Sequence, residues 1–314
     1  MNGNSEIDLN NIALQCGLDK TLDHEIVLHN IIELEEFYEK ETLLKIYNYL
    51  LETISNPQYL IQVIRCYDNY RDNRILPSVA NILKKNVDFE DDDAIDLRVI
   101  CAKSIANHKD TTYVTLLLDC MSNKKEHYKV RLACADALGK IGDRFAVTPL
   151  IDVVKDEDEK SVYLKETAAK ALGSIGDDRA VEPLISILHT KNGIFSKFSF
   201  LKEKIIEALD KLNIHNELIF TALKKSLYDV SPMVRINAIE AIMNSEDYRA
   251  EACIKPCLTD PDDEVKKNAL IALYNLSDRT ILDEVIETDE YSEYLKEVAQ
   301  ELIDEYENCE DEDE

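Results

Sequence analysis

The chain has 314 residues, a formal net charge of -27 at pH 7 and 45% hydrophobic residues. That apolar content is ordinary for a globular protein and excludes a disordered acidic chain. Only seven glycines and seven prolines occur, which favours helices with tight connections over many short strands. The acidity argues against a nucleic-acid partner, because the phosphate backbone would be repelled.

Residues 1–22 are expected to form a partly disordered N-terminal segment. They lack the basic start and long apolar core of a signal peptide. No later run reaches the roughly 18 apolar residues of a membrane span. We therefore predict a soluble, cytoplasmic protein without a membrane partner. Its eight cysteines are scattered and are expected to be reduced and buried.

Residues 23–95 are predicted to hold irregular helical repeats. Two helix pairs fit loosely, within residues 24–53 and 60–85. Six tyrosines occur here: Tyr38, Tyr47, Tyr49, Tyr59, Tyr67 and Tyr70. We expect them to fill the core with their hydroxyls near the surface. An acidic run at residues 88–96 lengthens the connection to the next region.

A periodic unit dominates residues 96–294, the predicted regular repeat array. Similar segments begin at Leu97, Val130, Leu164, Leu201, Val234, Val265 and Leu295, a mean period of 33 residues. Apolar residues three and four apart mark one helix face, and recurring alanines allow close helix approach. A second helix follows, as in residues 144–155 and 179–190. One such pair cannot bury its faces alone, so the pairs are expected to stack.

Residues 295–314 are expected to form a terminal helix and an acidic disordered tail. Residues 261–314 carry 20 acidic and 4 basic side chains, residues 1–96 carry 19 and 8, and residues 97–260 carry 24 of each. The regular array is therefore neutral, and the excess charge lies at the two ends. A run of like charge is typical of solvated chain. An acidic arm for a basic partner is the alternative.

Two segments, VRLACADALGKIGDRFAVTPLIDVV and LKETAAKALGSIGDDRAVEPLISIL, resemble the short HEAT-like repeats of the phycobilisome-lyase class. The resemblance is strong over residues 97–276. It implies an all-α fold, an α-solenoid (right-handed superhelix) of stacked antiparallel helix pairs of the HEAT/armadillo kind. Asp229 with Arg235 and Asp260 with Lys266 match the acidic–basic spacing that HEAT repeats use as a ladder between units.

The resemblance also raises two enzymatic alternatives. Deoxyhypusine hydroxylases carry several His-Glu pairs near the starts of the first helices. The corresponding positions here, 131–132, 165–166, 235–236 and 266–267, hold no His, and the one such dipeptide is His24-Glu25. An iron site needs convergent imidazole and carboxylate ligands, so this activity is not expected. A bilin-lyase-like enzyme, or an accessory subunit acting on a tetrapyrrole–protein conjugate, is kept as the alternative function.

We find no catalytic, cofactor-binding or metal-ligating motif in the sequence. We therefore predict a non-catalytic scaffold or adaptor, without cofactors, that binds a protein partner through a concave face made by the second helices. A basic partner would suit the acidic chain, and the oligomeric state stays open.

The candidate partner-binding residues lie off the apolar seam of the second helices or in an apolar, mildly basic insertion at residues 189–200. They are Asp152, Lys155, Ser186, His189, Ile194, Phe195, Phe198 and Lys225. The insertion carries three of the seven phenylalanines. It is either a recognition loop or the start of the next helix, with its aromatic side chains in the core.

Overall fold

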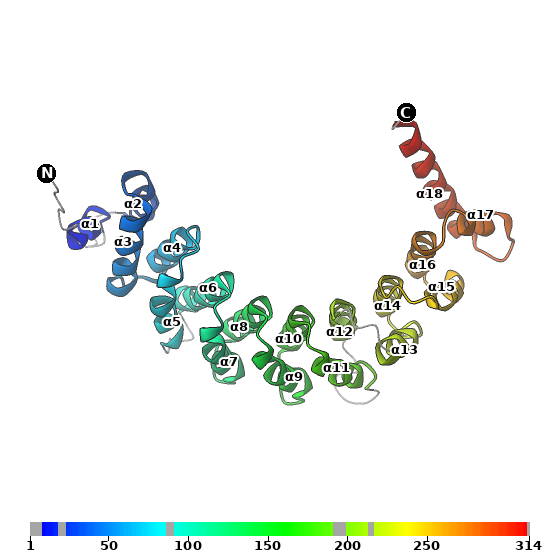
Figure 1. The fold of residues 1–314 in the computed structure, drawn as a ribbon, viewed down its shortest axis with the longest axis horizontal. Helices are drawn as coiled ribbons and strands as arrows, with labels where there is room; N and C mark the ends of the chain where they lie inside the picture. Colours follow the sequence, from blue (N-terminus) through cyan, green and yellow to red (C-terminus); the bar gives the residue numbers. More distant parts are fainter. Residues whose placement is uncertain (1–7, 18–22, 86–90, 191–198, 213–216, 313–314) are drawn as a thin grey trace. The chain divides into compact units, whose positions relative to one another are not determined.

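The computed structural model describes residues 8–17, 23–85, 91–190, 199–212 and 217–312, with the backbone alone from residue 306 onward. Within these ranges every regular element is helical, which confirms the all-α prediction. The chain divides into an N-terminal body, residues 1–149, and a C-terminal body, residues 150–314. Figure 1 shows the helices in chain order.

The N-terminal body begins with a short helix and continues as helix pairs. Its α-helices are α1 (Leu9–Gln15), α2 (His24–Phe37), α3 (Lys40–Thr53), α4 (Pro57–Asp68), α5 (Leu76–Lys84), α6 (Asp92–His108), α7 (Val114–Ser122) and α8 (Tyr128–Ile141). Helix α6 packs against α4, α5 and α8. Three short 3-10 turns precede the second helices: η1 (Asn73–Ile75), η2 (Thr111–Tyr113) and η3 (Arg144–Ala146). Helix α9 (Val147–Lys155) crosses the boundary between the bodies.

The C-terminal body repeats the same arrangement. Its elements are α10 (Val162–Ile175), η4 (Asp178–Ala180), α11 (Val181–Leu188), α12 (Ser199–Lys211), α13 (Glu217–Ser226), α14 (Pro232–Asn244), α15 (Ala250–Ile254), η6 (Lys255–Thr259), α16 (Asp263–Leu276), α17 (Thr280–Glu287) and α18 (Glu293–Glu312). Helix α12 packs between α10 and α14, and α14 packs against α16. Helix α18 continues into the residues expected to form an unfolded tail, where glutamates are compatible with a helix.

An aspartate makes the corner between two helices in six of the repeats within the described ranges. The side chain of Asp177 accepts a hydrogen bond from the backbone nitrogen of Arg179 at 3.0 Å. The same bond to the residue two positions later occurs at Asp72, Asp110, Asp143, Asp247 and Asp278. Gly142 and Gly176 end α8 and α10 with φ of 79° and 73°, a left-handed conformation that glycine adopts without strain.

Small residues bring the first helices of the C-terminal body close together. A Cβ atom placed on Gly173 of α10 would lie 2.7 Å from the Cα atom of Ala208 on α12. Ala208 is 1% exposed, so the two helices meet almost backbone to backbone. This contact confirms that small residues allow the close approach.

The acidic–basic ladder joins one repeat to the next. Arg235 donates from Nε and Nη2 to the carboxylate of Asp260 at 2.8 and 2.7 Å, and from Nη1 to the carbonyl of Asp229 at 2.8 Å. Lys202 donates from Nζ to the carboxylate of Asp229 at 2.6 Å. Asp260 and Asp229 therefore each pair with the basic side chain of the preceding repeat. Lys266 instead pairs with Asp263 at 2.6 Å. The expected pairing of Asp260 with Lys266 is therefore wrong.

Two of the N-terminal tyrosines are core residues along their whole length. Tyr47 and Tyr67 are fully buried, with ring centroids 6.1 Å apart. Their hydroxyl oxygens are also buried, so the prediction that the hydroxyls lie near the surface is wrong for this pair. Burial raises the pKa of Tyr67 to about 12 and raises that of Tyr47 further.

Candidate partner-binding surface

The helices of the C-terminal body, taken by itself, form two rows. Figure 1 shows the first helices α10, α12 and α14 on the inner side of its bend and the second helices α11, α13 and α15 on the outer side. Helices α10 and α12 meet closely at Gly173 and Ala208, whereas α11 and α13 contact each other much less. The row with the closer packing takes the inner side. The prediction that the second helices make the concave face is therefore wrong for this body.

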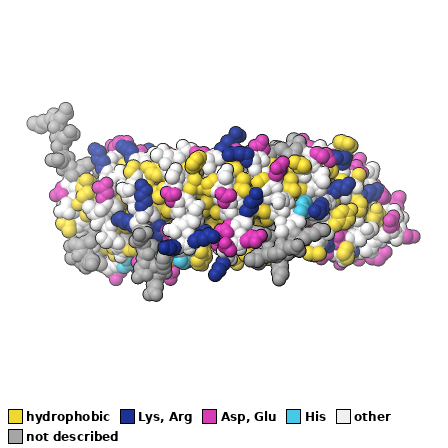
Figure 2. Space-filling model, turned by 90° about the horizontal axis from the view of Figure 1, so that it is seen from below, with side chains coloured by type: hydrophobic (Ala, Val, Ile, Leu, Met, Phe, Trp, Pro, Cys, Tyr) yellow, Lys and Arg dark blue, Asp and Glu magenta, His cyan; other side chains and the backbone are white. Residues whose placement is uncertain are grey.

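The predicted partner-binding residues within the described ranges lie on α9, which continues the outer row, and on α11 and α13 or at their ends. Four have exposed side chains off the apolar seam: Asp152, Lys155, Ser186 and Lys225. Three others lie outside the described residues: Ile194, Phe195 and Phe198. Figure 2 views the molecule from the side on which α9 and α11 lie, and there basic, acidic and apolar side chains are interspersed. Whether this surface contacts a partner stays a prediction.

His189 and Lys225 are brought together from two second helices. His189 is half-buried at the end of α11. Burial lowers the pKa of its imidazole, and the Lys225 ammonium lowers it further, against a hydrogen bond to the backbone of Ala222. The ring is therefore mostly neutral at pH 7. Its Nε2 atom is buried, so the ring packs beside the lysine as an uncharged group.

An apolar row, which the sequence analysis missed, runs along the first helices. Tyr163, Phe200 and Met233 are each the second residue of α10, α12 and α14. They are 70%, 68% and 51% exposed. Exposed apolar side chains scattered singly need no explanation. These three occupy the same place in successive repeats, so the stacking aligns them along one edge.

Carboxylates follow the apolar row on the same helix faces. Glu166 lies three residues after Tyr163, and Glu203 and Glu207 lie three and seven residues after Phe200. Residues at these spacings share one side of a helix. We call the apolar row and these carboxylates, with Glu240 of α14, the first-helix face.

The carboxylates of the first-helix face differ in exposure: Glu203 is buried, Glu166 and Glu207 are half-buried, and Glu240 is exposed. Burial raises the pKa of Glu166 and of Glu203, although Lys204 favours their charged forms. Glu203 raises the pKa of Glu166, and Glu207 raises that of Glu203. Lys204 itself donates from Nζ to Oε1 of Glu207 at 2.6 Å. A further cation near the half-buried Glu166 would therefore stabilise its charged form.

Three further observations bear on function. No helix in the described ranges is long and apolar enough to cross a membrane. Among the same residues, no group of three or more His, Cys, Asp or Glu side chains could hold a metal ion. The seven described cysteines are free thiols, and all but Cys253 are buried, which agrees with the prediction for those six.

Comparison with known proteins identifies the family. The model of the HEAT-repeat family matches residues 83–163, 124–197 and 220–303, which together make up more than half of the chain. The protein therefore belongs to the HEAT-repeat family. The resemblance and the α-solenoid fold class predicted from the sequence are both confirmed.

Several solved structures have a similar fold. The karyopherin Kap121p, bound to the extreme C-terminus of the protein phosphatase Cdc14p, gives a TM-score of 0.58 at 12% identity, covering 95% of this chain and 38% of that chain. The Escherichia coli protein YibA gives 0.51 at 16% identity, covering 90% and 97%. The CpcE–CpcF complex of phycocyanin lyase from Nostoc sp. PCC7120 gives 0.45 at 19%, covering 74% and 87%. At these identities the similarity shows the fold alone. No curated protein sequence matches this chain.

Proposed function

We propose that this protein is a scaffold that binds a protein partner along the first-helix face of its C-terminal body. The observation that carries the proposal is the recurrence of Tyr163, Phe200 and Met233 as exposed side chains at one position of three successive repeats. Covering a large apolar side chain is worth about 1.5–3 kcal/mol. Solenoids use extended surfaces of this kind to bind partners.

The partner that suits this face is an extended basic segment. Neighbouring packed helices lie about 8–10 Å apart, which an extended chain spans in about three residues. Apolar side chains at that spacing would reach Tyr163, Phe200 and Met233 in turn. Basic side chains between them would face Glu166, whose pKa is raised by burial, and the exposed Glu240. The structure of the similarly folded Kap121p holds a chain terminus of Cdc14p, which supports a chain segment as the kind of partner.

Truncating the apolar row tests this proposal. We expect the triple variant Tyr163→Ala, Phe200→Ala, Met233→Ala to lose at least about a hundredfold in affinity, since each anchor contributes about 1 kcal/mol or more. The measurement is affinity capture with mass spectrometry, followed by titration of the recovered partner. The control is Phe37→Ala with Phe145→Ala, which removes exposed aromatic side chains from the N-terminal body. Equal affinity of the wild type and the triple variant would refute the proposal.

We propose the outer-row residues as a second contact region: Asp152, Lys155, Ser186, His189 and Lys225. Charge reversal by Lys155→Glu with Lys225→Glu is expected to weaken partner binding by about tenfold, because charges at an interface rim contribute modestly. The loss should shrink at high salt. An unchanged affinity would show that the partner does not contact these outer-row lysines. The bilin-lyase-like alternative has no specific support in the described residues.

A further inference from the structure

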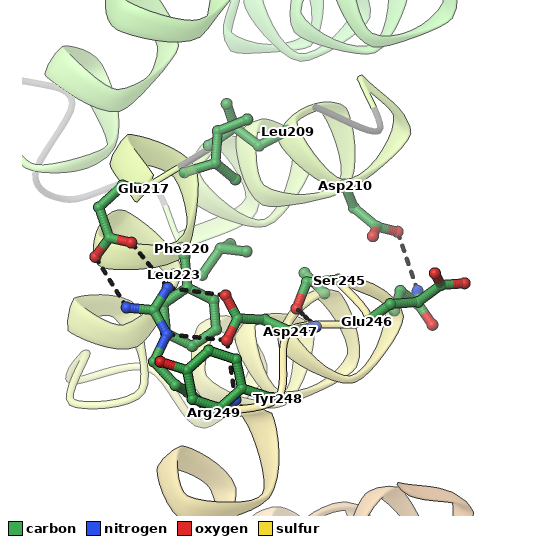
Figure 3. Close-up of a pocket in the computed structure, with 13 residues that line it drawn as sticks. Leu209, Asp210, Glu217, Phe220, Leu223, Ser245, Glu246, Asp247, Tyr248 and Arg249 are labelled. Atoms are coloured by element: carbon green, nitrogen blue, oxygen red, sulfur yellow. Dashed lines mark hydrogen bonds and ion pairs between the residues drawn. The ribbon is translucent and has the colours of Figure 1, made fainter. Parts of the chain in front are cut away.

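A cavity of about 510 Å³ lies in the C-terminal body between α12, α13 and α14 (Figure 3). Its volume is within the range of about 300–1,000 Å³ typical of ligand pockets. The floor is apolar and is made by Leu209, Ile219, Phe220, Leu223 and Ala241. The rim is acidic, with carboxylates of Asp210, Glu217, Glu246 and Asp247 and one cation, Arg249.

Arg249 engages two of the four carboxylates. Its Nε and Nη2 atoms donate to Asp247 at 2.9 and 2.8 Å. Its Nη1 and Nη2 atoms donate to Glu217 at 3.1 and 2.8 Å. The centre of the guanidinium lies 4.2 Å from the ring centroid of Phe220. This wall therefore already holds one cation against an aromatic ring, an arrangement that stabilises positive charge.

The other two carboxylates lie across the cavity from this cluster. Figure 3 shows Asp210 and Glu246 on the side away from Glu217 and Arg249. Asp210 accepts a hydrogen bond from Nδ2 of Asn244 at 3.2 Å, and burial raises its pKa. Glu246 has a φ of 54°, a left-handed conformation that is uncommon for residues other than glycine. Lys109, Gly142 and Gly176 adopt the same conformation just before the corner aspartate of their repeats, so this φ belongs to the helix end.

We propose that this cavity binds an aliphatic cation, that is, an alkyl chain ended by an ammonium or guanidinium group. The alkyl chain would lie on the apolar floor, and the charged end would pair with Asp210 and Glu246. The proposal follows from charge complementarity, because the rim carries four carboxylates against the single guanidinium of Arg249. It uses residues outside the first-helix face and does not rest on the proposed function.

Calorimetric titration of the full chain with three probes tests the site. N-acetyl-lysine methylamide represents a protein side chain, and spermidine represents a free polyamine. N-acetyl-norleucine methylamide has the same kind of chain without the charge. The titrations are run at physiological ionic strength, where the screening length of about 8 Å suppresses binding to diffuse negative charge. We expect at least one cation to bind and the norleucine probe not to bind.

The double variant Asp210→Asn, Glu246→Gln is expected to weaken cation binding by at least about tenfold, since hydrogen bonds to charged groups are among the stronger ones. The matched control Glu182→Gln, Glu301→Gln removes two exposed carboxylates elsewhere in the same body and should leave binding unchanged. Binding of the lysine probe alone assigns a protein side chain as the ligand, and binding of spermidine assigns a polyamine. No binding of either cation, or equal binding by the double variant, overturns the site.

Discussion

Replacing Gly173 by valine is expected to destabilise the C-terminal body by about 3 kcal/mol, the upper part of the usual range for overpacking. A Cβ atom at this position would lie 2.7 Å from the Cα and 3.1 Å from the carbonyl oxygen of Ala208. These are backbone atoms, so no side-chain rotation relieves the contact. Helices α10 and α12 would have to separate, and the contacts that each makes with the other would weaken together.

Chemical denaturation followed by circular dichroism measures this effect. The control is Ser174→Val, which places the same side chain at the next residue of α10, where it is exposed. A valine at that position costs only a few tenths of a kcal/mol in helix propensity. If Gly173→Val were as stable as Ser174→Val, the close packing of the first helices would be contradicted.

Replacing Arg235 by methionine is expected to cost about 3 kcal/mol or more, because removing one partner of a buried pair leaves the other charge uncompensated. The side chains of Arg235 and Asp260 are each 9% exposed. The change also removes the hydrogen bond to the carbonyl of Asp229. The free energy of unfolding of the variant, measured in urea, gives the loss directly.

Two comparisons separate this effect from ordinary surface ion pairing. Lys255→Met removes a pair with Glu284 in which both side chains are 43% exposed, and it should cost less than about 1 kcal/mol. The double variant Arg235→Met, Asp260→Leu should recover much of the loss, since an apolar pair can replace a buried ion pair. A small loss in Arg235→Met would show that the ladder does not hold the repeats together.

Much of the fold could be predicted from the sequence because the repeat makes local patterns agree with the stacking. The apolar spacing gave the helices, and the left-handed Gly142 and Gly176 ended two of them. The ladder was predicted with the right residue types. The pairing was shifted by one repeat, because Arg235 reaches forward to Asp260. Which of two neighbouring carboxylates a side chain reaches depends on the spacing between repeats, which the sequence does not state.

The candidate sites were harder to predict because they depend on how the rows pack. Small residues on the first helices were visible in the sequence. Their effect on the bend could not be predicted, because it depends on whether the first helices pack more closely than the second helices do. The signal for Tyr163, Phe200 and Met233 was present, one position before the buried residue that opens each repeat. The cavity brings together Asp210, near the end of α12, and Glu246, just after the end of α14, and no local pattern links them.

Hydrogen exchange of the protein, alone and in complex with its captured partner, tests the proposed binding surface most directly. Amides exchange through local opening, which a bound segment suppresses. Binding along the first-helix face predicts slowed exchange in α10, α12 and α14, strongest at their N-terminal turns, where Tyr163, Phe200 and Met233 lie. Slowed exchange confined to α11 and α13, with the first helices unchanged, would contradict it.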